Sequence, residues 1–433
     1  MSGPVQPASI VDGIRRAVRS PHASSPFSVL DGYRGFAALS VLVFHVAAWN
    51  GLVYGRSFQA RALQGLGSLG VSIFFVLSGF LLFRPYVLGH LTGTKPRPWP
   101  RYLRHRFLRI LPAYWVALTA LFIILPNSPL LQIGGRPISF GDYVSFYTMT
   151  MSFRPGFAFK GLAVAWTLHI EIIFYLVLPM IAWAMASVSR LIGVTPRIRV
   201  RTTLVGLALM WVISLMYRTA TTWWWGAIAA PQRGWILNYL DWFAAGMLLA
   251  TAVAWKQCGG KLPRIVELAC LYPTVGWVVA LECYVACVFL AHPAGTPRLE
   301  TMSEVHIRFV LYAVIAVALL APVTIGTTTR DPMRRLMSSA PLLYFGTISY
   351  GVYLWHVIVR DRIVSTSWFH DIGPNFWVLL GATLVMSVIV ATASYYLVEK
   401  PLLRFKDPRS RGRAGPARRA RVPEAVPVGS RRS

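Results

Sequence analysis

The segment RGFAALSVLVFHVAAW, residues 34–49, is the stretch of sequence that decides the fold. It is almost entirely apolar, yet it begins with Arg34 and carries His45 eleven residues later. Eleven residues at about 100° each make roughly three helical turns, so the two side chains share one helix face about 16 Å apart. Ionisable groups inside a membrane are costly and usually face a cavity. The segment therefore predicts a transmembrane helix with a cation near one surface, an imidazole near mid-bilayer and a buried reaction site.

The composition of the whole chain is typical of a membrane protein. Of its 433 residues, 55% are hydrophobic and only 13% are charged, whereas a soluble chain carries about 25% charged residues. The net charge of +28 would indicate nucleic-acid binding in a soluble protein. Here the basic residues lie mostly in loops and in the C-terminal tail, so they indicate membrane topology and argue against nucleic acid as a partner. The expected fold class is an all-α, polytopic integral membrane protein.

Ten apolar windows are long enough, at about 20 residues, to cross a bilayer as helices. They lie near residues 36–54, 66–88, 107–125, 162–186, 203–217, 236–255, 267–291, 307–325, 341–360 and 376–398. The window at 203–217 is short and needs flanking residues to complete it. A further segment at 138–152 is interrupted by Asp142 and other polar residues, so it is either an extra span or a re-entrant piece.

The charges of the loops predict the sidedness of these spans. Without a span at 138–152 the basic clusters all fall on one side, which the positive-inside rule assigns to the cytoplasm. The clusters are Arg15/Arg16/Arg19, Arg97 through Arg109, Arg190 through Arg201, Lys256 through Arg264, Arg330 through Arg335 and the C-terminal tail. We therefore expect a multi-pass protein of the cell (plasma or inner) membrane, with ten spans and both termini in the cytoplasm.

One transmembrane domain is expected at 28–405, between two polar termini. Residues 1–27 form a polar cytoplasmic segment without a signal peptide, so the first span should remain as an uncleaved anchor. Residues 406–433 are rich in Arg, Pro, Gly and Ala, which predicts a disordered basic tail that can touch the lipid bilayer. The four cysteines predict neither a disulfide framework nor a metal site, and no metal or tightly bound cofactor is expected.

His45 is the first candidate for catalysis. Glu171 lies about 14 Å into the fourth span from one surface, and His45 about 16 Å into the first span from the other, so they can meet near the midplane. A carboxylate beside an imidazole holds its tautomer and raises its basicity, as a general base requires. The alternative is that the histidine only hydrogen-bonds a neighbouring helix.

Three further positions are open to a functional or a purely structural interpretation. Arg106 and Arg109 share one face of the third span near its cytoplasmic end, where they either clamp phosphates or snorkel to lipid headgroups. Ser78, followed by Gly79, either permits close helix approach or contacts a substrate.

The ninth span carries a polar stripe at helical spacing, formed by Gly346, Ser349, Tyr353 and His356. Such a stripe lines either a helix interface or a cavity. His356 is expected nearer the outer surface than His45, where it would serve the acceptor side.

Several motifs, in order along the chain, resemble the membrane-bound acyltransferase-3 family. They are LDGYRG at 30–35 with FH at 44–45, GVSIFFVLSGF at 70–80, RFLRILPAYW at 106–115, WTLHIEIIFY at 166–175, SYGVYLWH at 349–356 and EKPLLR at 399–404. The resemblance covers residues 28–405. Many members carry two adjacent acids in the fourth motif, whereas here Glu171 stands alone, which puts any role for a second carboxylate in doubt.

The resemblance implies an acyl-CoA-dependent O-acyltransferase of the bacterial cell envelope. The acyl group, acetyl or another short one, would go to a hydroxyl of a carbohydrate, a glycolipid or a glycosylated natural product. It also implies that Arg34 and His45 are essential. The residues and the resemblance together give His45, Glu171 and Arg34 as catalytic residues, and as contacts of substrate or acyl-CoA they give Arg106, Arg109, Ser78, Trp166, Tyr353 and His356.

Two chemical routes and one rival class of protein remain open. Coenzyme A would dock its phosphates on the arginines and bring its thioester to His45. That residue then acts as general base on the acceptor hydroxyl, or takes the acyl group itself as an acyl-imidazole. A transporter or exporter of a small solute or lipid would also need ten spans and intramembrane charges, although no internal repeat of the transporter kind is visible.

Overall fold

The computed structural model describes residues 28–94, 98–133, 135–154, 156–229, 234–291, 301–371 and 375–404. The expectations for the segment 1–27 and the tail 406–433 lie outside the described residues. Within them, ten helical segments are long and apolar enough to cross a membrane, which confirms the all-α polytopic fold. The helices are α2 (Val29–Trp49), α3 (Phe58–Thr92), α4 (Trp99–Ile124), α6 (Ala165–Ile192), α7 (Pro196–Ala229), α8 (Leu240–Gln257), α10 (Pro273–Leu290), α11 (Met302–Thr324), α13 (Ala340–Val364) and α15 (Phe376–Ser394).

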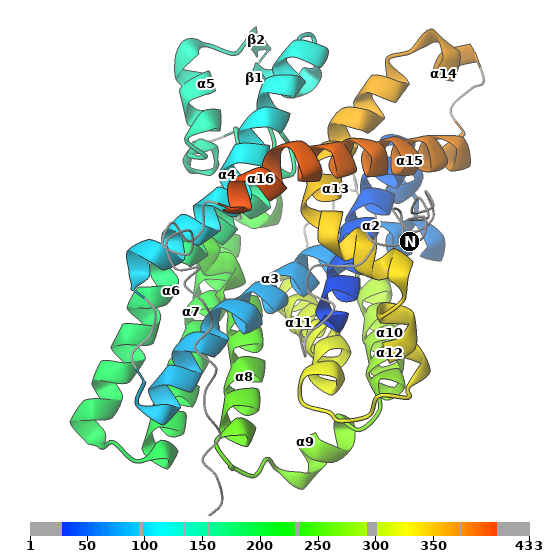
Figure 1. The fold of residues 1–433 in the computed structure, drawn as a ribbon. Helices are drawn as coiled ribbons and strands as arrows, with labels where there is room; N and C mark the ends of the chain where they lie inside the picture. The colour runs from blue at the N-terminus through cyan, green and yellow to red at the C-terminus, as the bar shows by residue number, and fades with distance from the viewer. Residues whose placement is uncertain are drawn as a thin grey trace, which may run out of the picture.

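Short elements connect or extend these helices (Figure 1). A π-helical turn, Tyr395–Glu399, and α16 (Lys400–Leu403) continue α15. Three more short helices are α9 (Arg264–Ala269), α12 (Pro332–Met337) and α14 (Ser367–Asp371). Single 3-10 turns are found at Leu52–Tyr54, Pro129–Leu131, Met151–Phe153 and Ile236–Tyr239.

Several boundaries differ from those predicted. α7 begins at Pro196, well before the apolar window at 203–217, because its first turns carry arginines that a hydropathy window excludes. α3 runs for 35 residues, about 52 Å at 1.5 Å per residue, which is longer than a bilayer core is thick. The window at 267–291 contains the end of α9 and then α10, separated by a break before Pro273.

The segment at 138–152 is not a transmembrane helix. It holds α5 (Phe140–Tyr147), whose 8 residues are far fewer than the roughly 20 a span needs. A two-residue antiparallel ribbon precedes it, β1 (Gln132–Ile133) with β2 (Arg136–Pro137). Figure 1 shows these elements together at one end of the helix bundle.

An ion-pair cluster on Asp142 ties this small region together. The carboxylate is fully buried and accepts hydrogen bonds from Arg136 Nη1 at 2.9 Å and from the Ser139 backbone N–H at 2.7 Å, while Arg154 Nη1 lies 2.9 Å away. Burial alone would raise the pKa of Asp142, but these donors together hold that pKa well below its ordinary value. The single acid of this segment therefore organises a loop rather than interrupting a span.

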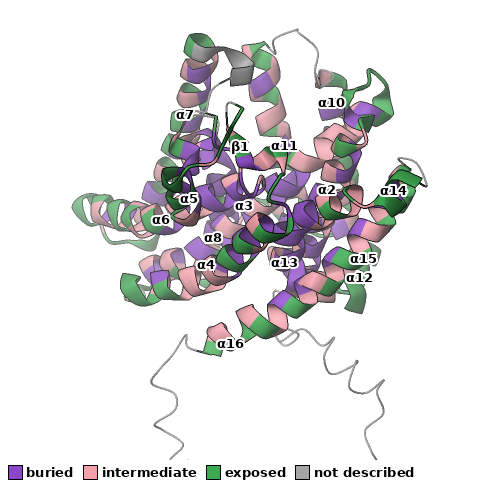
Figure 2. Cartoon of the chain, turned by 90° about the horizontal axis from the view of Figure 1, so that it is seen from above, coloured by how far each residue is buried: buried purple, intermediate pink, exposed green. Residues whose placement is uncertain are grey.

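The centre of the bundle is formed by α3 with α2, α8 and α13, which carry many of the buried residues (Figure 2). Glycines let the backbones meet. A Cβ on Gly79 of α3 would lie 2.2 Å from the Phe243 carbonyl oxygen of α8, and one on Gly346 of α13 would lie 1.9 Å from the Asp31 carbonyl oxygen of α2. Close approach at small residues is how helices associate in a membrane, where apolar side chains gain little by leaving lipid.

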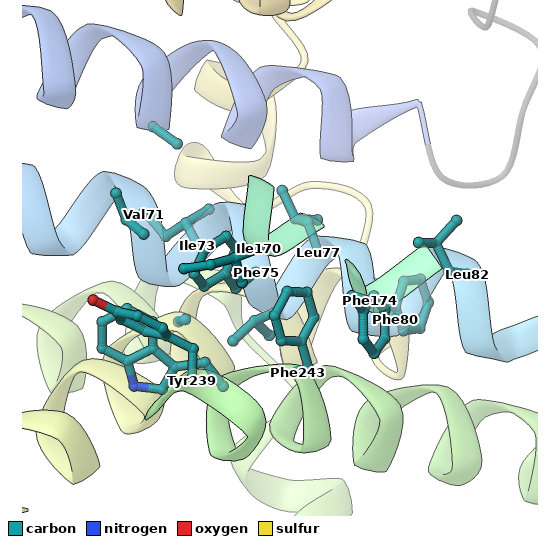
Figure 3. Packing of buried hydrophobic residues seen from close by; sticks show 14 of the residues in the cluster. Val71, Ile73, Phe75, Leu77, Phe80, Leu82, Ile170, Phe174, Tyr239 and Phe243 are labelled. Carbon is teal, nitrogen blue, oxygen red and sulfur yellow. The ribbon is translucent and has the colours of Figure 1, made fainter. Parts of the chain in front are cut away.

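Stacked aromatic rings fill the space where α3, α6 and α8 meet (Figure 3). Phe243 of α8 lies 4.7 Å from Phe75 of α3 and 4.0 Å from Phe174 of α6, measured between ring centroids, with nearly parallel planes. Phe174 and Phe243 are fully buried. Offset aromatic pairs of this kind contribute about 0.5–1.5 kcal/mol beyond the area they bury. Phe75 also lines the first cavity described below, so this packing makes one of its walls rigid.

Candidate functional site

The first cavity, which we call the arginine cavity, measures about 100 Å³ and lies between α2, α3, α4, α6 and α13. Arg34 of α2 and Arg106 and Arg109 of α4 line it together with Glu171 of α6. Three guanidinium groups therefore surround a single carboxylate, and the lining carries net positive charge. Such a narrow, positively charged space suits an anionic group with an elongated arm.

Glu171 is fixed by two hydroxyl groups inside this cavity. Its Oε1 accepts a hydrogen bond of 2.8 Å from Ser78 Oγ of α3 and one of 2.7 Å from Tyr175 OH, one helical turn further along α6. Ser78 lines the cavity as well, whereas its neighbour Gly79 faces α8. The two interpretations that were open for Ser78 and Gly79 thus apply to different residues. Gly79 permits close helix approach, and Ser78 faces the cavity.

Arg34 and Arg106 differ in the partners of their guanidinium groups. Arg34 lies 3.6 Å from Asp31, one helical turn earlier in α2, and its side chain is 19% exposed. The Nε of Arg106 is buried and finds no hydrogen-bond partner among the described residues. A buried donor without a partner costs free energy, so the guanidinium of Arg106 gains from any acceptor that comes into the cavity.

The second cavity, which we call the histidine cavity, is larger, at about 550 Å³. His45 of α2 stands in its wall, and its ring is only partly buried. The aromatic residues that line it most prominently are Phe44, Trp166, Tyr239, Trp242, Phe309 and Tyr312. The lining also includes the polar side chains of Gln64, Asn238 and Arg308. The volume and the mixture of aromatic faces with a few polar groups are typical of small-molecule sites.

The two cavities adjoin each other. Val71 of α3 and Tyr353 of α13 line both of them. Tyr353 is held in place by a 2.6 Å hydrogen bond with Thr167 Oγ1, and its ring packs edge-on against Phe74. These two side chains therefore form a wall that both cavities share.

His45 contacts a second histidine rather than a carboxylate. Its Nδ1 lies 3.0 Å from the Val41 carbonyl oxygen and 3.1 Å from Nε2 of His356, which is completely buried on α13. Nδ1 of His356 in turn lies 3.0 Å from the Val352 carbonyl oxygen. Arg360, one turn further along α13, donates a 3.0 Å hydrogen bond to the His45 carbonyl oxygen.

This arrangement corrects two predictions. Glu171 does not meet His45, because it lies in the arginine cavity and bonds to Ser78 and Tyr175. His356 does not lie nearer the outer surface than His45, since the two rings are in contact. The polar stripe of α13 was predicted to line either a helix interface or a cavity, and it does both. It forms a helix interface at His356 and a cavity wall at Tyr353.

The structure brings the remaining predicted residues to one of the two cavities. Arg34, Arg106, Arg109 and Ser78 line the arginine cavity, Trp166 lines the histidine cavity, and Tyr353 lines both. Only His356 is absent from the residues described as lining either one.

Sequence reasoning missed a buried ion pair at the histidine cavity, whose lining includes Arg218. Arg218 of α7 donates a 2.6 Å hydrogen bond to Asp241 of α8, and both side chains are nearly inaccessible, at 3% and 0% exposed. Its guanidinium also lies 4.3 Å from the ring centroid of Phe309. The available signal was a charge inside each of two neighbouring spans, but Arg218 fell just outside the apolar window at 203–217.

The chain is similar in sequence to known proteins. A family model described as "Acyltransferase domain" matches residues 27–396. "Putative peptidoglycan O-acetyltransferase YrhL" of Bacillus subtilis is 28% identical over 393 residues, which are 86% of this chain and 54% of the relative. "Peptidoglycan O-acetyltransferase OatA" of Listeria monocytogenes is 24% identical over 386 residues, 86% of this chain and 55% of the relative.

A third relative is similar in length to this chain. "Nodulation protein 10" of Rhizobium leguminosarum is 24% identical over 405 residues, 89% of this chain and 95% of the relative. The chain thus spans about half the length of the first two relatives and nearly all of the third. No solved structure matches the chain significantly.

Proposed function

The chain belongs to the acyltransferase domain family, whose model matches residues 27–396, and we propose that it is a multi-pass membrane O-acyltransferase acting on a carbohydrate hydroxyl. The names of two relatives, both peptidoglycan O-acetyltransferases, support acetyl as the transferred group and a cell-envelope glycan as the acceptor. The observation that carries the proposal is that Val71 and Tyr353 line both cavities, because this places an anion site beside a cavity that holds an imidazole. The donor would reach His45 between these two side chains, along a route that we call the passage.

The arginine cavity is the proposed donor site. Acyl-CoA carries its phosphates at one end and its thioester at the end of a long pantetheine arm. Guanidinium groups bind phosphate oxygens with paired, charge-assisted hydrogen bonds, which suits Arg34, Arg106 and Arg109. These arginines lie within two to three turns of the first residues of α2 and α4. The charges of the loops favour a cytoplasmic location of both termini in a plasma-membrane protein. In that orientation the donor approaches from inside the cell.

The histidine cavity is the proposed acceptor site. Carbohydrates present apolar ring faces that pack on aromatic side chains and hydroxyl groups that need hydrogen-bond partners. Trp166, Tyr239 and Trp242 supply such faces, and Gln64 and Asn238 supply polar groups. Oε1 of Gln64 is buried and has no hydrogen-bond partner among the described residues, so its side chain would have to turn toward the cavity to bond an acceptor hydroxyl.

His45 handles the chemistry by one of two routes. In the direct route its imidazole takes the proton of the acceptor hydroxyl while the hydroxyl oxygen attacks the thioester carbonyl carbon. The carbon–oxygen bond forms, the carbon–sulfur bond breaks, and the imidazolium returns the proton to the coenzyme A thiolate. In the covalent route Nε2 attacks the thioester carbonyl carbon, so a carbon–nitrogen bond forms as the carbon–sulfur bond breaks and the thiolate leaves. The acceptor oxygen then attacks that carbon, the carbon–nitrogen bond breaks, and the hydroxyl proton goes to the coenzyme A thiolate.

The experiment is acyl transfer by membranes that contain the protein. With [14C]acetyl-CoA and soluble peptidoglycan fragments, we expect label in the glycan, and His45→Ala should abolish it. His370→Ala is the matched control, because His370 is an exposed histidine outside both cavities and should leave transfer unchanged. Equal transfer by the wild type and His45→Ala would refute the proposal. Solute flux through proteoliposomes without any coenzyme would instead support the transporter alternative.

A further inference from the structure

We propose that His356 is a positioning residue that holds the ring of His45 in one tautomer, with a proton on Nδ1 and the lone pair of Nε2 free for the reaction. The inference rests on the proposed function, in which His45 handles the acceptor proton or the acyl group. His356 itself is completely buried and is not among the residues described as lining either cavity. It therefore acts on the reaction through His45 rather than by touching a substrate.

The proton positions on His356 follow from its own helix. Its Nδ1 lies 3.0 Å from the Val352 carbonyl oxygen. A carbonyl oxygen can only accept a hydrogen bond, so Nδ1 must carry a proton. In a neutral imidazole the other nitrogen then has a lone pair, and Nε2 of His356 is an acceptor that faces His45.

The same reasoning then determines the tautomer of His45. Its Nδ1 has two neighbours, the Val41 carbonyl oxygen at 3.0 Å and Nε2 of His356 at 3.1 Å. Both neighbours are acceptors, so Nδ1 of His45 carries the proton and its Nε2 keeps the lone pair. Because His45 lines the histidine cavity, a lone pair on Nε2 is available to a general base or to a nucleophile.

His356 thus takes the position that a carboxylate occupies in a Ser-His-Asp triad, accepting from Nδ1–H of the reactive imidazole. A neutral acceptor orients the ring without placing a second charge inside the bundle, where an isolated charge is expensive. When His45 gains a proton on Nε2 during the reaction, its Nδ1–H bond to His356 persists and strengthens, because a hydrogen bond from a charged donor is stronger.

His356 would also contact His45 if its role were only to hold α13 against α2. Other contacts of α13 with its neighbouring helices help to separate this structural role from the positioning of His45. α13 already holds α2 through the 3.0 Å hydrogen bond of Arg360 to the His45 carbonyl oxygen and through the close approach of Gly346 to Asp31. Tyr344 OH forms a 2.8 Å hydrogen bond to Thr392 that joins α13 to α15 far from His45. Tyr344→Phe therefore removes an interhelical hydrogen bond of α13 without disturbing the histidine pair.

The direct test is nitrogen NMR of the full chain in nanodiscs, with all nine histidines labelled with 15N. The His45 signals are assigned by their loss in His45→Gln. We expect Nδ1 of His45 to carry the proton in the wild type and in Tyr344→Phe. In His356→Phe only the Val41 carbonyl oxygen still accepts from Nδ1–H, so the fraction of His45 protonated on Nδ1 should fall. In His356→Gln the amide oxygen, which can also accept from Nδ1–H, should restore that fraction.

Kinetics supply the second readout, with acetyl-CoA as donor and a peptidoglycan disaccharide as acceptor. His356→Phe should lower kcat by about 100-fold, the low end of what a positioned general base contributes. The KM for acetyl-CoA should change by less than about twofold, because the arginine cavity is untouched. His356→Gln should recover most of kcat, and Tyr344→Phe should behave as wild type.

A proton on Nε2 of His45 in the wild type would overturn the proposal, as would an unchanged tautomer in His356→Phe. Equal loss of kcat in the Phe and Gln variants would also overturn it, since any structural contact would then suffice. If His356→Phe fails to fold, the wild-type spectrum and the Gln variant still decide. The Nδ1–H form in a protein without acyl transfer would support the positioning of His45 while refuting the proposed function.

Discussion

The hydroxyl of Ser78 on α3 donates a 2.8 Å hydrogen bond to the carboxylate of Glu171 on α6, within a cavity that three guanidinium groups also line. The bond fixes the only carboxylate described in the lining of the arginine cavity. Removing that charge leaves the guanidinium groups to repel one another in a space with little solvent. The carboxylate therefore stabilises the empty donor site.

Glu171→Gln should accordingly lower the melting temperature of the detergent-solubilised protein. The amide keeps an oxygen that can accept from Ser78, so the lost property is charge. Added coenzyme A should raise the melting temperature more in the variant than in the wild type, because its phosphates replace the missing negative charge. The control is Glu267→Gln, an exposed position on α9. Equal melting temperatures for wild type and variant would contradict this role.

Arg106→Ala and Arg109→Ala should each raise the KM for acetyl-CoA by about tenfold, the lower end of what a hydrogen bond to a charged group is worth. The value of kcat should fall less, because the phosphates lie far from the reacting carbonyl. Arg104→Ala is the matched control, since Arg104 is exposed on the same helix and outside the arginine cavity. An unchanged KM for acetyl-CoA in both cavity variants would mean that these arginines only set the membrane topology and do not bind the donor.

Val71 and Tyr353 should set the length of acyl group that passes between the cavities. Val71→Ala widens the passage, so the preference for acetyl-CoA over butyryl-CoA in kcat/KM should fall by about tenfold, the value of two buried methylene groups at about 0.8 kcal/mol each. Leu81→Ala, which changes the arginine cavity away from the passage, should leave the ratio unaltered. A ratio that responds equally to both changes would remove Val71 from this role.

The Asp142 cluster predicts how the region around α5 responds to acid. Its pKa is held below the ordinary value of 3.8 by Arg136, Ser139 and Arg154, although burial opposes this. A carboxylate with a depressed pKa stabilises the folded region above 3.8, and that contribution is lost as pH falls through the lower folded value. The protection factors of the α5 amides, which correct for the pH dependence of intrinsic exchange, should therefore be constant from pH 7 to pH 5 and fall only below about pH 4. Asp142→Asn should exchange faster already at pH 7; protection equal to the wild type there would contradict the cluster's role.

The ten spans could be predicted because the bilayer imposes a length on every helix that crosses it. The gathering of Arg34, Arg106 and Arg109 was also foreseeable, since all lie near the same ends of their helices. The start of α7 could not be predicted from hydropathy, because the arginines of its first turns lower the hydropathy of that part of the helix.

The histidine pair shows where one-dimensional reasoning stops. In the structure, His45 and His356 each lie sixteen residues after the first residue of their helices. The apolar windows that start at 36 and 341 instead place them nine and fifteen residues in, so the sequence predicted different depths. Depth does not tell which helices are neighbours. That α13 rather than α6 faces His45 depends on the close approach of Gly346 to Asp31, a property of backbone packing that the side-chain pattern does not reveal.

The central claim is that a donor in the arginine cavity presents its acyl carbon to His45 through the passage at Val71 and Tyr353. The most direct test is a cryo-EM structure with acetonyl-dethia-coenzyme A, in which a methylene group replaces the thioester sulfur. We predict phosphates against Arg34, Arg106 and Arg109 and the ketone carbon about 3.5 Å from Nε2 of His45, a distance suited to reaction. A coenzyme bound with its acyl end outside the passage and away from the imidazole would contradict the account.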